Sequence, residues 1–266
     1  MNKNNAENNA LMSFWEHLDV LRKYVVRSLC VVILFSIIAF FCKQWVFDII
    51  LAPQNNLFIT YQWIDKISST FNIPINDNFN VQLINTGLTQ QFLIHIKVSL
   101  LVGLLCASPY VIFALFEFIS PALYENEKKY SFRLLFFAFL LFFVGVLTSY
   151  FIVFPFTFRF LGTYQVSENI TNLITLESYI STLILLSVCL GILFEMPILA
   201  WLLSRMNLIN SDLMIKYRRH AIVLILVLAA IITPTTDVFT LSIVFFPIYI
   251  LYEVSIIIVK YVSSKR

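Results

Sequence analysis

The sequence predicts an all-α polytopic membrane protein with six transmembrane helices, and three observations support this fold class. Of the 266 residues, 60% are hydrophobic and only 12% are charged, whereas soluble domains carry about 25% charged residues. The apolar residues gather in six runs, and several of these exceed the ~20 residues that a helix needs to cross a bilayer. Lysine and arginine gather in alternate loops between the runs. We therefore expect one membrane domain over residues 13–260, with tails at 1–12 and 261–266.

The transmembrane spans differ in length. They are expected at about 24–43, 92–118, 132–158, 176–204, 219–233 and 238–259. The fifth is short, because only residues 221–232 are both apolar and uncharged, and a helix of that length covers ~18 Å. A bilayer accommodates a short span by thinning locally. The first run is too long for the apolar core of a signal peptide, so we expect it to stay attached to the chain.

The basic residues predict the orientation, because positively charged loops are retained on the cytoplasmic side of a membrane. With the amino terminus inside, the cytoplasmic segments hold 14 of the 18 Lys and Arg residues, leaving out only Lys43, Lys66, Lys97 and Arg159. An even number of spans then puts both termini in the cytoplasm, and we expect a multi-pass protein of the inner cell membrane. The net charge of +3 is a signal of topology, so no nucleic-acid partner is expected.

Two segments outside the spans have their own pattern. Residues 1–12 are polar and Asn-rich, which favours disorder. The stretch "SFWEHLDVLRKY" predicts an amphipathic helix that lies along the cytoplasmic interface, with Trp15 at headgroup level, before the chain turns into the first span. Between the first two spans, residues 44–91 are too long for a simple turn. They predict an extracytoplasmic cap of short helices that packs on the membrane surface.

The sequence lacks the motifs of nucleotide-binding, zinc and hydrolase sites. The four cysteines, Cys30, Cys42, Cys106 and Cys189, lie in or beside apolar runs without metal-ligand spacing. The three histidines are scattered along the chain. We expect free thiols, no metal, no cofactor and no enzymatic activity.

The stretch "GILFEMPILA" places Glu195 and Pro197 inside an apolar run. A carboxylate at mid-membrane costs roughly 2 to 4 kcal/mol by insertion scales. Glu195 is either a buried carboxyl that bonds Ser or Tyr hydroxyls of a neighbouring helix, or a polar site that faces a concavity and binds a partner's membrane helix. Pro197 frees the carbonyl of Leu193 and should bend the helix there. A third interpretation is a proton- or ion-coupled secondary transporter that uses Glu195.

Four motifs, in order, resemble a known family. They are "HLDVLRK" at 17–23, "SPALYENE" at 120–127, "FEMP" at 194–197, and "TPTTDVF" at 233–239 followed by "LYE" at 251–253. Together they resemble the TatC family, a subunit of the twin-arginine protein translocase, over residues 13–260. The resemblance implies a receptor that binds the twin-arginine signal peptides of folded cargo. It also implies a homo-oligomeric complex in the lipid bilayer, with single-span TatA/TatB-type partners and energy from the proton motive force.

The resemblance also implies roles for particular residues. Glu127 matches the loop glutamate that contacts the paired arginines, although a solvated ion-pair cluster with Lys128, Lys129 and Arg133 is the alternative. Phe118, Pro121 and Tyr124 belong to the same signal-peptide-binding loop. Glu195 and Pro197 match the polar position of the fourth span. Further motif positions are His17, Leu21, Arg22, Pro53, Asp237 and Glu253.

The sequence departs from the family pattern at Val20, where the family has a glutamate. Arginine pairs are recognised best by carboxylates in bidentate geometry, so the missing acid needs a replacement. Glu16 lies one turn earlier, about 40° away around a helix, and Asp19 lies about 100° away. We predict that Glu16 and Asp19 supply the negative charge, with Glu16 better placed by angle.

Overall fold

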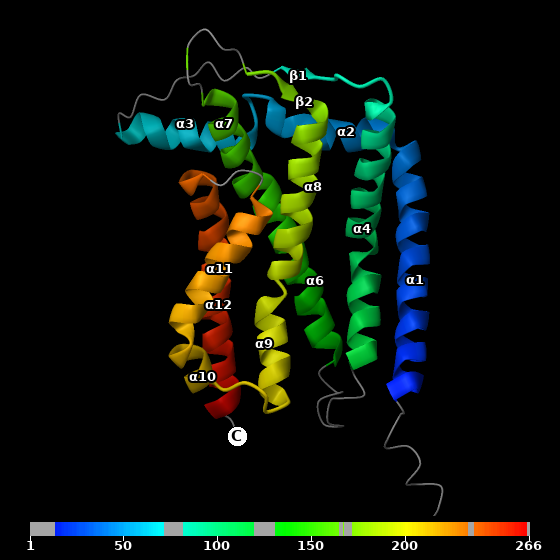
Figure 1. Cartoon of the computed structure of the whole chain (residues 1–266), viewed down its shortest axis with the longest axis vertical. Coiled ribbons are helices and arrows are strands. Elements are labelled where there is room, and N and C mark those ends of the chain that lie inside the picture. The colour runs from blue at the N-terminus through cyan, green and yellow to red at the C-terminus, as the bar shows by residue number, and fades with distance from the viewer. Residues whose placement is uncertain are drawn as a thin grey trace, which may run out of the picture.

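Long helices form wherever an apolar run has no residue that breaks it. The computed structural model describes residues 14–71, 82–119, 131–164, 167, 172–233 and 237–264. The bundle helices, in chain order, are α1 (Phe14–Phe41), α4 (Gln90–Ile119), α6 (Ser131–Thr148), α7 (Phe154–Thr163), α8 (Leu176–Leu193), α9 (Met196–Arg205), α10 (Ser211–Lys216), α11 (Arg218–Ile232) and α12 (Val238–Ser264). They run side by side, as Figure 1 shows.

Five helical stretches in the described part of the chain are long and apolar enough to cross a membrane. They are Leu18–Phe41, Gln90–Phe118, Leu134–Thr163, Leu176–Arg205 and Val238–Ser263. The remaining expected span corresponds to α11, which has 15 residues and is therefore only about 22 Å long. The all-α membrane fold is confirmed, while the crossing by α11 stays a prediction.

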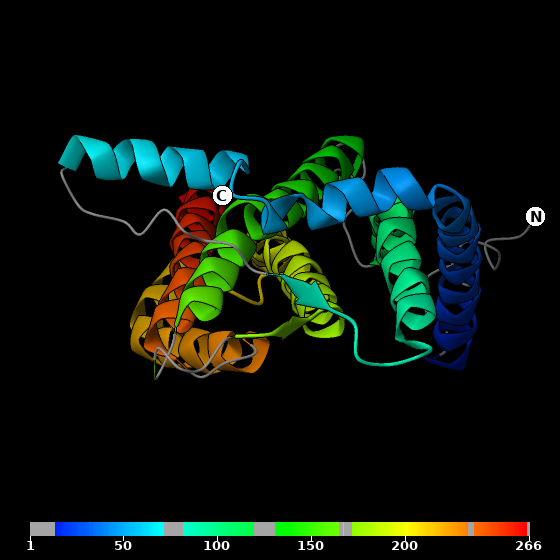
Figure 2. The ribbon, with the colours of Figure 1, turned by 90° about the horizontal axis from the view of Figure 1, so that it is seen from above.

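A cap closes one end of the bundle, as predicted for residues 44–91. It consists of α2 (Lys43–Leu51), the 3₁₀ turn η1 (Ala52–Gln54), α3 (Ile59–Phe71) and the strand β1 (Leu83–Ile84). Figure 2 shows α2 and α3 running one after the other across the bundle. The strand pairs in parallel with β2 (Ile174–Thr175), which directly precedes α8. We call this the cap end, and the opposite end, where α1 begins and α4 ends, the base.

Buried hydrogen bonds fasten the cap to the bundle. Tyr61 of α3 is 2% exposed, and its hydroxyl donates to the carbonyl of Pro53 in η1 at 3.0 Å and of Pro155 in α7 at 3.3 Å. Burial raises the pKa of Tyr61, so the hydroxyl keeps the proton that it donates. The ion pair between Arg159 and Asp65 (3.4 Å) joins α7 to α3 a second time.

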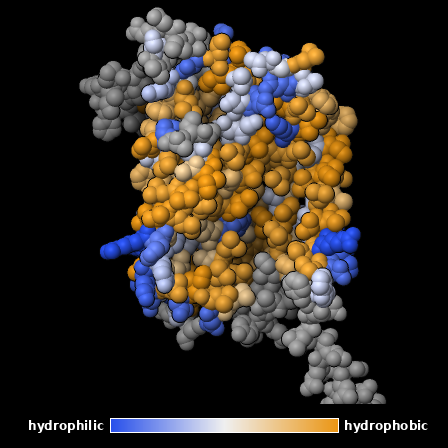
Figure 3. All heavy atoms as spheres, viewed as in Figure 1, coloured by the Kyte–Doolittle hydropathy of each residue, from blue (hydrophilic) through white to orange (hydrophobic). Residues whose placement is uncertain are grey.

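Many large apolar side chains of the bundle helices are exposed. Figure 3 shows hydrophobic residues over the middle of one face and hydrophilic residues toward the two ends. α1 packs along α4, α6 packs on α8, and α9 packs on α12. Because α1 touches mainly α4, most of its apolar side chains, such as Leu29 and Leu34, remain exposed.

One expectation about helix boundaries needs correction, and two of the expected spans are interrupted. The amphipathic segment does not turn into the first span, because α1 is one continuous helix from Phe14 and contains neither Gly nor Pro. The third span contains a π-helical turn, η3 (Ser149–Val153), before Pro155. The fourth span is two helices, α8 and α9, with a turn at Phe194 and Glu195.

Candidate functional site

The start of α1 and the end of α4 meet at the base. The two helices are antiparallel and pack along their length (Figure 1). The Tyr24 hydroxyl of α1 donates a hydrogen bond to the Glu117 carboxylate of α4. Phe118 follows and is half-buried, and α4 ends at Ile119. The "SPALYENE" motif, with Glu127, follows α4 directly in the sequence.

Val20 lies on the side of α1 that faces α4. Buried or half-buried residues recur every four positions along α1, at Val20, Tyr24, Ser28, Val32 and Ser36, and residues four apart lie on the same side of a helix. Tyr24, one turn after Val20, holds Glu117 from the neighbouring helix. Glu117 thus brings a carboxylate to the side of α1 on which the family pattern has its glutamate.

Asp19 and Arg22 lie at the same end of α1 but off this face. Both side chains are exposed, so Asp19 presents its charge to the surroundings rather than toward α4. Leu21 is half-buried. The base therefore holds two exposed carboxylates, Asp19 and Glu117, on different sides of one helix pair.

Several predicted site residues lie outside what the structure describes. Glu127, Pro121 and Tyr124 fall in the segment 120–130. The backbone of Glu16 and His17 belongs to α1, but their side chains lie outside the described residues. Their roles remain predictions.

Sequence reasoning misses Glu117. In the run "ALFEFI", one acid near the end of an apolar stretch reads as a helix boundary, and nothing in the local pattern relates it to position 20. The two residues are nearly a hundred positions apart, and only the antiparallel packing of α1 on α4 brings their helix ends together. One sequence signal could have pointed to Glu117. It directly precedes Phe118, which the family resemblance assigns to the signal-peptide-binding loop.

A second polar site lies half-way along the bundle, at the turn between α8 and α9 (Figure 1). Glu195 is half-buried, and its Oε1 is buried without a hydrogen-bond partner among the described residues. This favours an available polar site over a carboxyl already satisfied by Ser or Tyr hydroxyls. The backbone carbonyl of Glu195 starts α9, accepting from the N–H groups of Ile198 and Leu199 at 3.0 Å each.

Pro197 lies at the bend that the sequence predicted. It is buried in the first turn of α9, where proline is tolerated because no helical carbonyl is available to its nitrogen. On the other side of the turn, the end of α8 packs closely against α6, since a Cβ on Gly145 of α6 would lie 2.8 Å from the carbonyl oxygen of Leu190 of α8. The interruption is thus built into the packing, and it fixes Glu195 in place.

The remaining motif positions have structural contacts. Asp237 precedes α12, and its Oδ2 accepts from the backbone N–H of Thr240 at 2.8 Å. Glu253 of α12 pairs with Arg218 of α11 at 2.6 Å. The buried Pro53 accepts from Tyr61, as described above.

Basic residues gather at the base. Arg22 lies near the start of α1, Arg205 ends α9, Lys216 ends α10, and Arg218 and Arg219 begin α11. The base thus carries these basic residues together with the acids Asp19, Glu117 and Asp212. No group of three or more His, Cys, Asp or Glu that could hold a metal ion occurs among the residues described, and the cysteines are free thiols.

Comparison with known proteins agrees with the motifs. The family model of TatC, the Sec-independent protein translocase protein, matches residues 16–247. The TatC protein of Blattabacterium sp. subsp. Periplaneta americana (strain BPLAN) is 36% identical over 260 residues, covering 96% of this chain and 97% of its own. The TatC protein of Aquifex aeolicus (strain VF5) is 34% identical over 256 residues, covering 96% and 98%.

A crystal structure of a twin-arginine translocase receptor, TatC, superposes with a TM-score of 0.74 at 34% identity. It covers 93% of this chain and 100% of the other. These relatives are protein translocase components, and the secondary-transporter interpretation of Glu195 is not supported. The chain is a multi-pass membrane protein that belongs to the TatC family of Sec-independent protein translocase proteins.

Proposed function

We propose that this chain is the receptor subunit of a twin-arginine translocase and that it binds signal peptides at the base. The family match over residues 16–247 carries this proposal. The junction of α1 and α4 supports it, because Glu117 and Asp19 expose carboxylates there, and the segment with Glu127 follows the end of α4 in the sequence.

The base faces the cytoplasm in this proposal. Its cluster of Lys and Arg residues is the kind that is retained on the cytoplasmic side, and the cap then lies outside the cytoplasm. Single cysteines placed at Leu57, in the exposed cap, and at Asn207, in the exposed turn after α9, test this orientation in a chain whose own four cysteines are replaced. An impermeant thiol reagent added to intact cells should label only Leu57→Cys. Labelling of Asn207→Cys alone would reverse the orientation.

The chemistry of the paired arginines selects the residues. Each guanidinium is planar and permanently charged, and carboxylates bind it with two parallel hydrogen bonds. Glu127 binds one arginine in this proposal. Glu117 binds the other in place of the family glutamate missing at Val20, while Glu16 and Asp19 add negative charge. Hydrogen bonds to charged groups contribute about 1.5–3 kcal/mol.

Peptide binding tests the assignment. We expect Glu117→Gln to weaken binding of a labelled twin-arginine peptide about tenfold or more, since each 1.4 kcal/mol is tenfold, and Glu117→Gln with Glu127→Gln to abolish it at physiological salt. Asp65→Asn is the matched control, because it removes one exposed carboxylate from the cap end. Binding that survives the double substitution would refute the site.

The competing candidates for the missing carboxylate are compared in the same assay. If Glu16→Gln with Asp19→Asn weakens binding as much as Glu117→Gln, the charge is shared over the base. If that pair has no effect, Glu117 alone replaces the acid at Val20. A twin-lysine peptide, which cannot form the bidentate contact, should bind weakly to every variant.

We further propose that Glu195 binds a polar group in the membrane helix of a TatA/TatB-type single-span partner. Its unpartnered Oε1 in an apolar setting makes a hydrogen bond from another helix favourable. Glu195→Ala should leave peptide binding unchanged and block transport of folded cargo by inverted vesicles that hold a proton gradient. Loss of peptide binding with intact partner crosslinking would contradict this role.

A further inference from the structure

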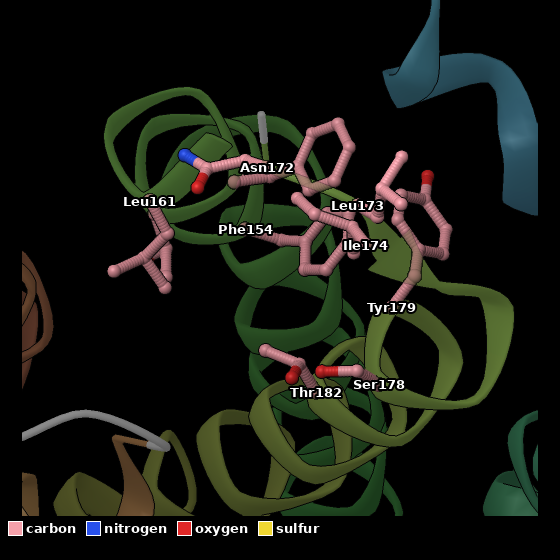
Figure 4. A pocket seen from close by; sticks show the side chains of 10 residues that line it. Phe154, Leu161, Asn172, Leu173, Ile174, Ser178, Tyr179 and Thr182 are labelled. Atoms are coloured by element: carbon pink, nitrogen blue, oxygen red, sulfur yellow. The ribbon is translucent and has the colours of Figure 1, made fainter. Parts of the chain in front are cut away.

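A cavity of about 290 Å³ lies between α7, α8 and the chain that leads into β2. Figure 4 looks into it and shows that aromatic rings and short polar side chains share its wall. Phe154, Phe158 and Tyr179 form the aromatic side. The cavity is far from the α1–α4 junction and from Glu195, so neither proposed site uses it.

One buried hydroxyl in this wall has no partner. Thr157 is 1% exposed, and its Oγ1 forms no hydrogen bond with any described residue. Two other polar groups of the wall are engaged, since the Tyr179 hydroxyl donates to the carbonyl of Ile50 at 2.9 Å and the Asn172 amide donates to the carbonyl of Tyr164 at 2.7 Å. A buried hydroxyl without a partner is unfavourable, so Thr157 provides a donor that a ligand can satisfy.

The wall selects a neutral, amphiphilic ligand. None of the described residues that line the cavity is charged, so an ion or a phosphate would lose its hydration without compensation from them. The volume corresponds to roughly ten water-sized groups, at about 30 Å³ each. It therefore admits a small molecule or part of a chain molecule.

The position of the cavity in the bundle indicates which molecule binds there. Thr157 lies near the cap end of the stretch Leu134–Thr163, and Ser178 and Thr182 lie in the first two turns of Leu176–Arg205. At the end of a transmembrane stretch, the bilayer changes from acyl chains to ester groups. An ester carbonyl accepts a hydrogen bond and carries no charge.

We propose that this cavity binds one acyl-ester arm of a phospholipid, with the Thr157 hydroxyl donating to the ester carbonyl. The acyl chain lies against Phe154, Phe158 and Tyr179. The phosphate stays outside, where the cap end meets water. The lipid completes the contact between α7 and α8.

Ester recognition is tested with two lipids that differ only in the carbonyl. The purified full chain in detergent is titrated with a diester phosphatidylcholine and with the diether analogue of the same chain length, and the midpoint of thermal unfolding is followed. The wild type should gain more stability from the diester. An equal gain from both lipids would overturn the proposal.

Thr157→Val removes the hydroxyl and keeps the shape. This variant should unfold at a higher temperature without lipid, because a buried unpaired hydroxyl is gone, and the diester and diether should stabilise it equally. Thr148→Val is the control, since the Thr148 hydroxyl already donates to the carbonyl of Val144 at 2.8 Å, and the diester preference should persist. Thr157→Ser keeps the hydroxyl and should keep the preference; a preference retained by Thr157→Val refutes the assignment.

The identity of the occupant is checked in the membrane. A photoreactive residue at Ser178, which lines the cavity and is exposed, should form adducts with lipid when the chain is expressed in cells. Adducts with another protein in place of lipid would show that a partner occupies the cavity and would overturn the lipid assignment. This test does not depend on signal-peptide binding.

Discussion

Asp237 shows at the residue scale how a family motif position acquires a physical role. Its Oδ2 accepts from the backbone N–H of Thr240, and its Oδ1 accepts from the Thr240 hydroxyl at 2.6 Å. Its backbone carbonyl also accepts from Leu241 at 3.1 Å. This is the geometry of an N-cap residue, whose side chain satisfies a donor in the first helical turn. The aspartate of "TPTTDVF" thus starts α12.

The role of Asp237 as the N-cap residue of α12 predicts a difference between two substitutions. Asp237→Ala should reduce the free energy of unfolding by about 1 kcal/mol, within the 0.5–2 kcal/mol range for lost caps, whereas Asp237→Asn should have little effect because asparagine caps equally well. Thermal unfolding in detergent measures both. If Asp237→Asn lost as much stability as Asp237→Ala, the negative charge and not the cap would be the stabilising feature.

At the element scale, the contact of α1 with α4 positions the base. The two helices are in tight contact at Gly103, where a Cβ would lie 2.0 Å from the Ser36 hydroxyl oxygen and 2.6 Å from its backbone nitrogen. At the cap end, the His95 ring of α4 stacks on Phe40 of α1 with centroids 4.0 Å apart. A shift of α1 along α4 would therefore also separate Tyr24 from Glu117.

Gly103→Ala should therefore act on stability and on peptide binding together. The added methyl group cannot fit without moving α1, and overpacking of this kind costs about 1–3 kcal/mol. We expect a lower thermal midpoint and weaker twin-arginine peptide binding. Gly87→Ala is the control, because its nearest neighbour would be the side chain of Gln90, at 3.2 Å. Unchanged binding by a destabilised Gly103→Ala would show that the base is positioned independently of this contact.

At the scale of the whole molecule, the helices differ in length across one bilayer. The five long stretches have 24 to 30 residues, whereas α11 has 15 and spans about 22 Å against a hydrocarbon core of ~30 Å. The ion pair between Arg218 and Glu253 sits at the base end of α11, so the polar end of this short helix is attached to α12. We infer that the bilayer thins beside α11.

Bilayer thickness should then change the stability of the protein. In nanodiscs of phosphatidylcholines that differ only in acyl-chain length, the thermal midpoint should be highest in lipids thinner than the usual bilayer, because mismatch costs fractions of a kcal/mol per Å. A variant with one extra turn of leucines in α11 should shift that optimum toward thicker lipids. An optimum in thick bilayers for the natural chain would exclude thinning at α11.

The sequence predicted much of the fold, whereas the site residues that it names remain predictions. The apolar runs, the cap, the short helix and the break at Pro197 follow from composition and local chemistry, and the structure agrees with them. The course of α1 was predicted wrongly, because its amphipathic start differs in polarity from the rest but contains no residue that ends a helix. Glu127, Glu16 and Asp19 come from the motifs and remain predictions.

The sequence by itself determined that this chain is a membrane-embedded helical protein of the TatC type, because hydrophobic length and ordered motifs are properties of contiguous residues. Only the tertiary structure decided which distant groups meet. It paired Tyr24 with Glu117, gave Asp237 its place at the start of α12, and left the Thr157 hydroxyl in a cavity wall with no hydrogen-bond partner among the described residues. The physical reason is that these contacts depend on how helices pack side by side, which local periodicity does not record.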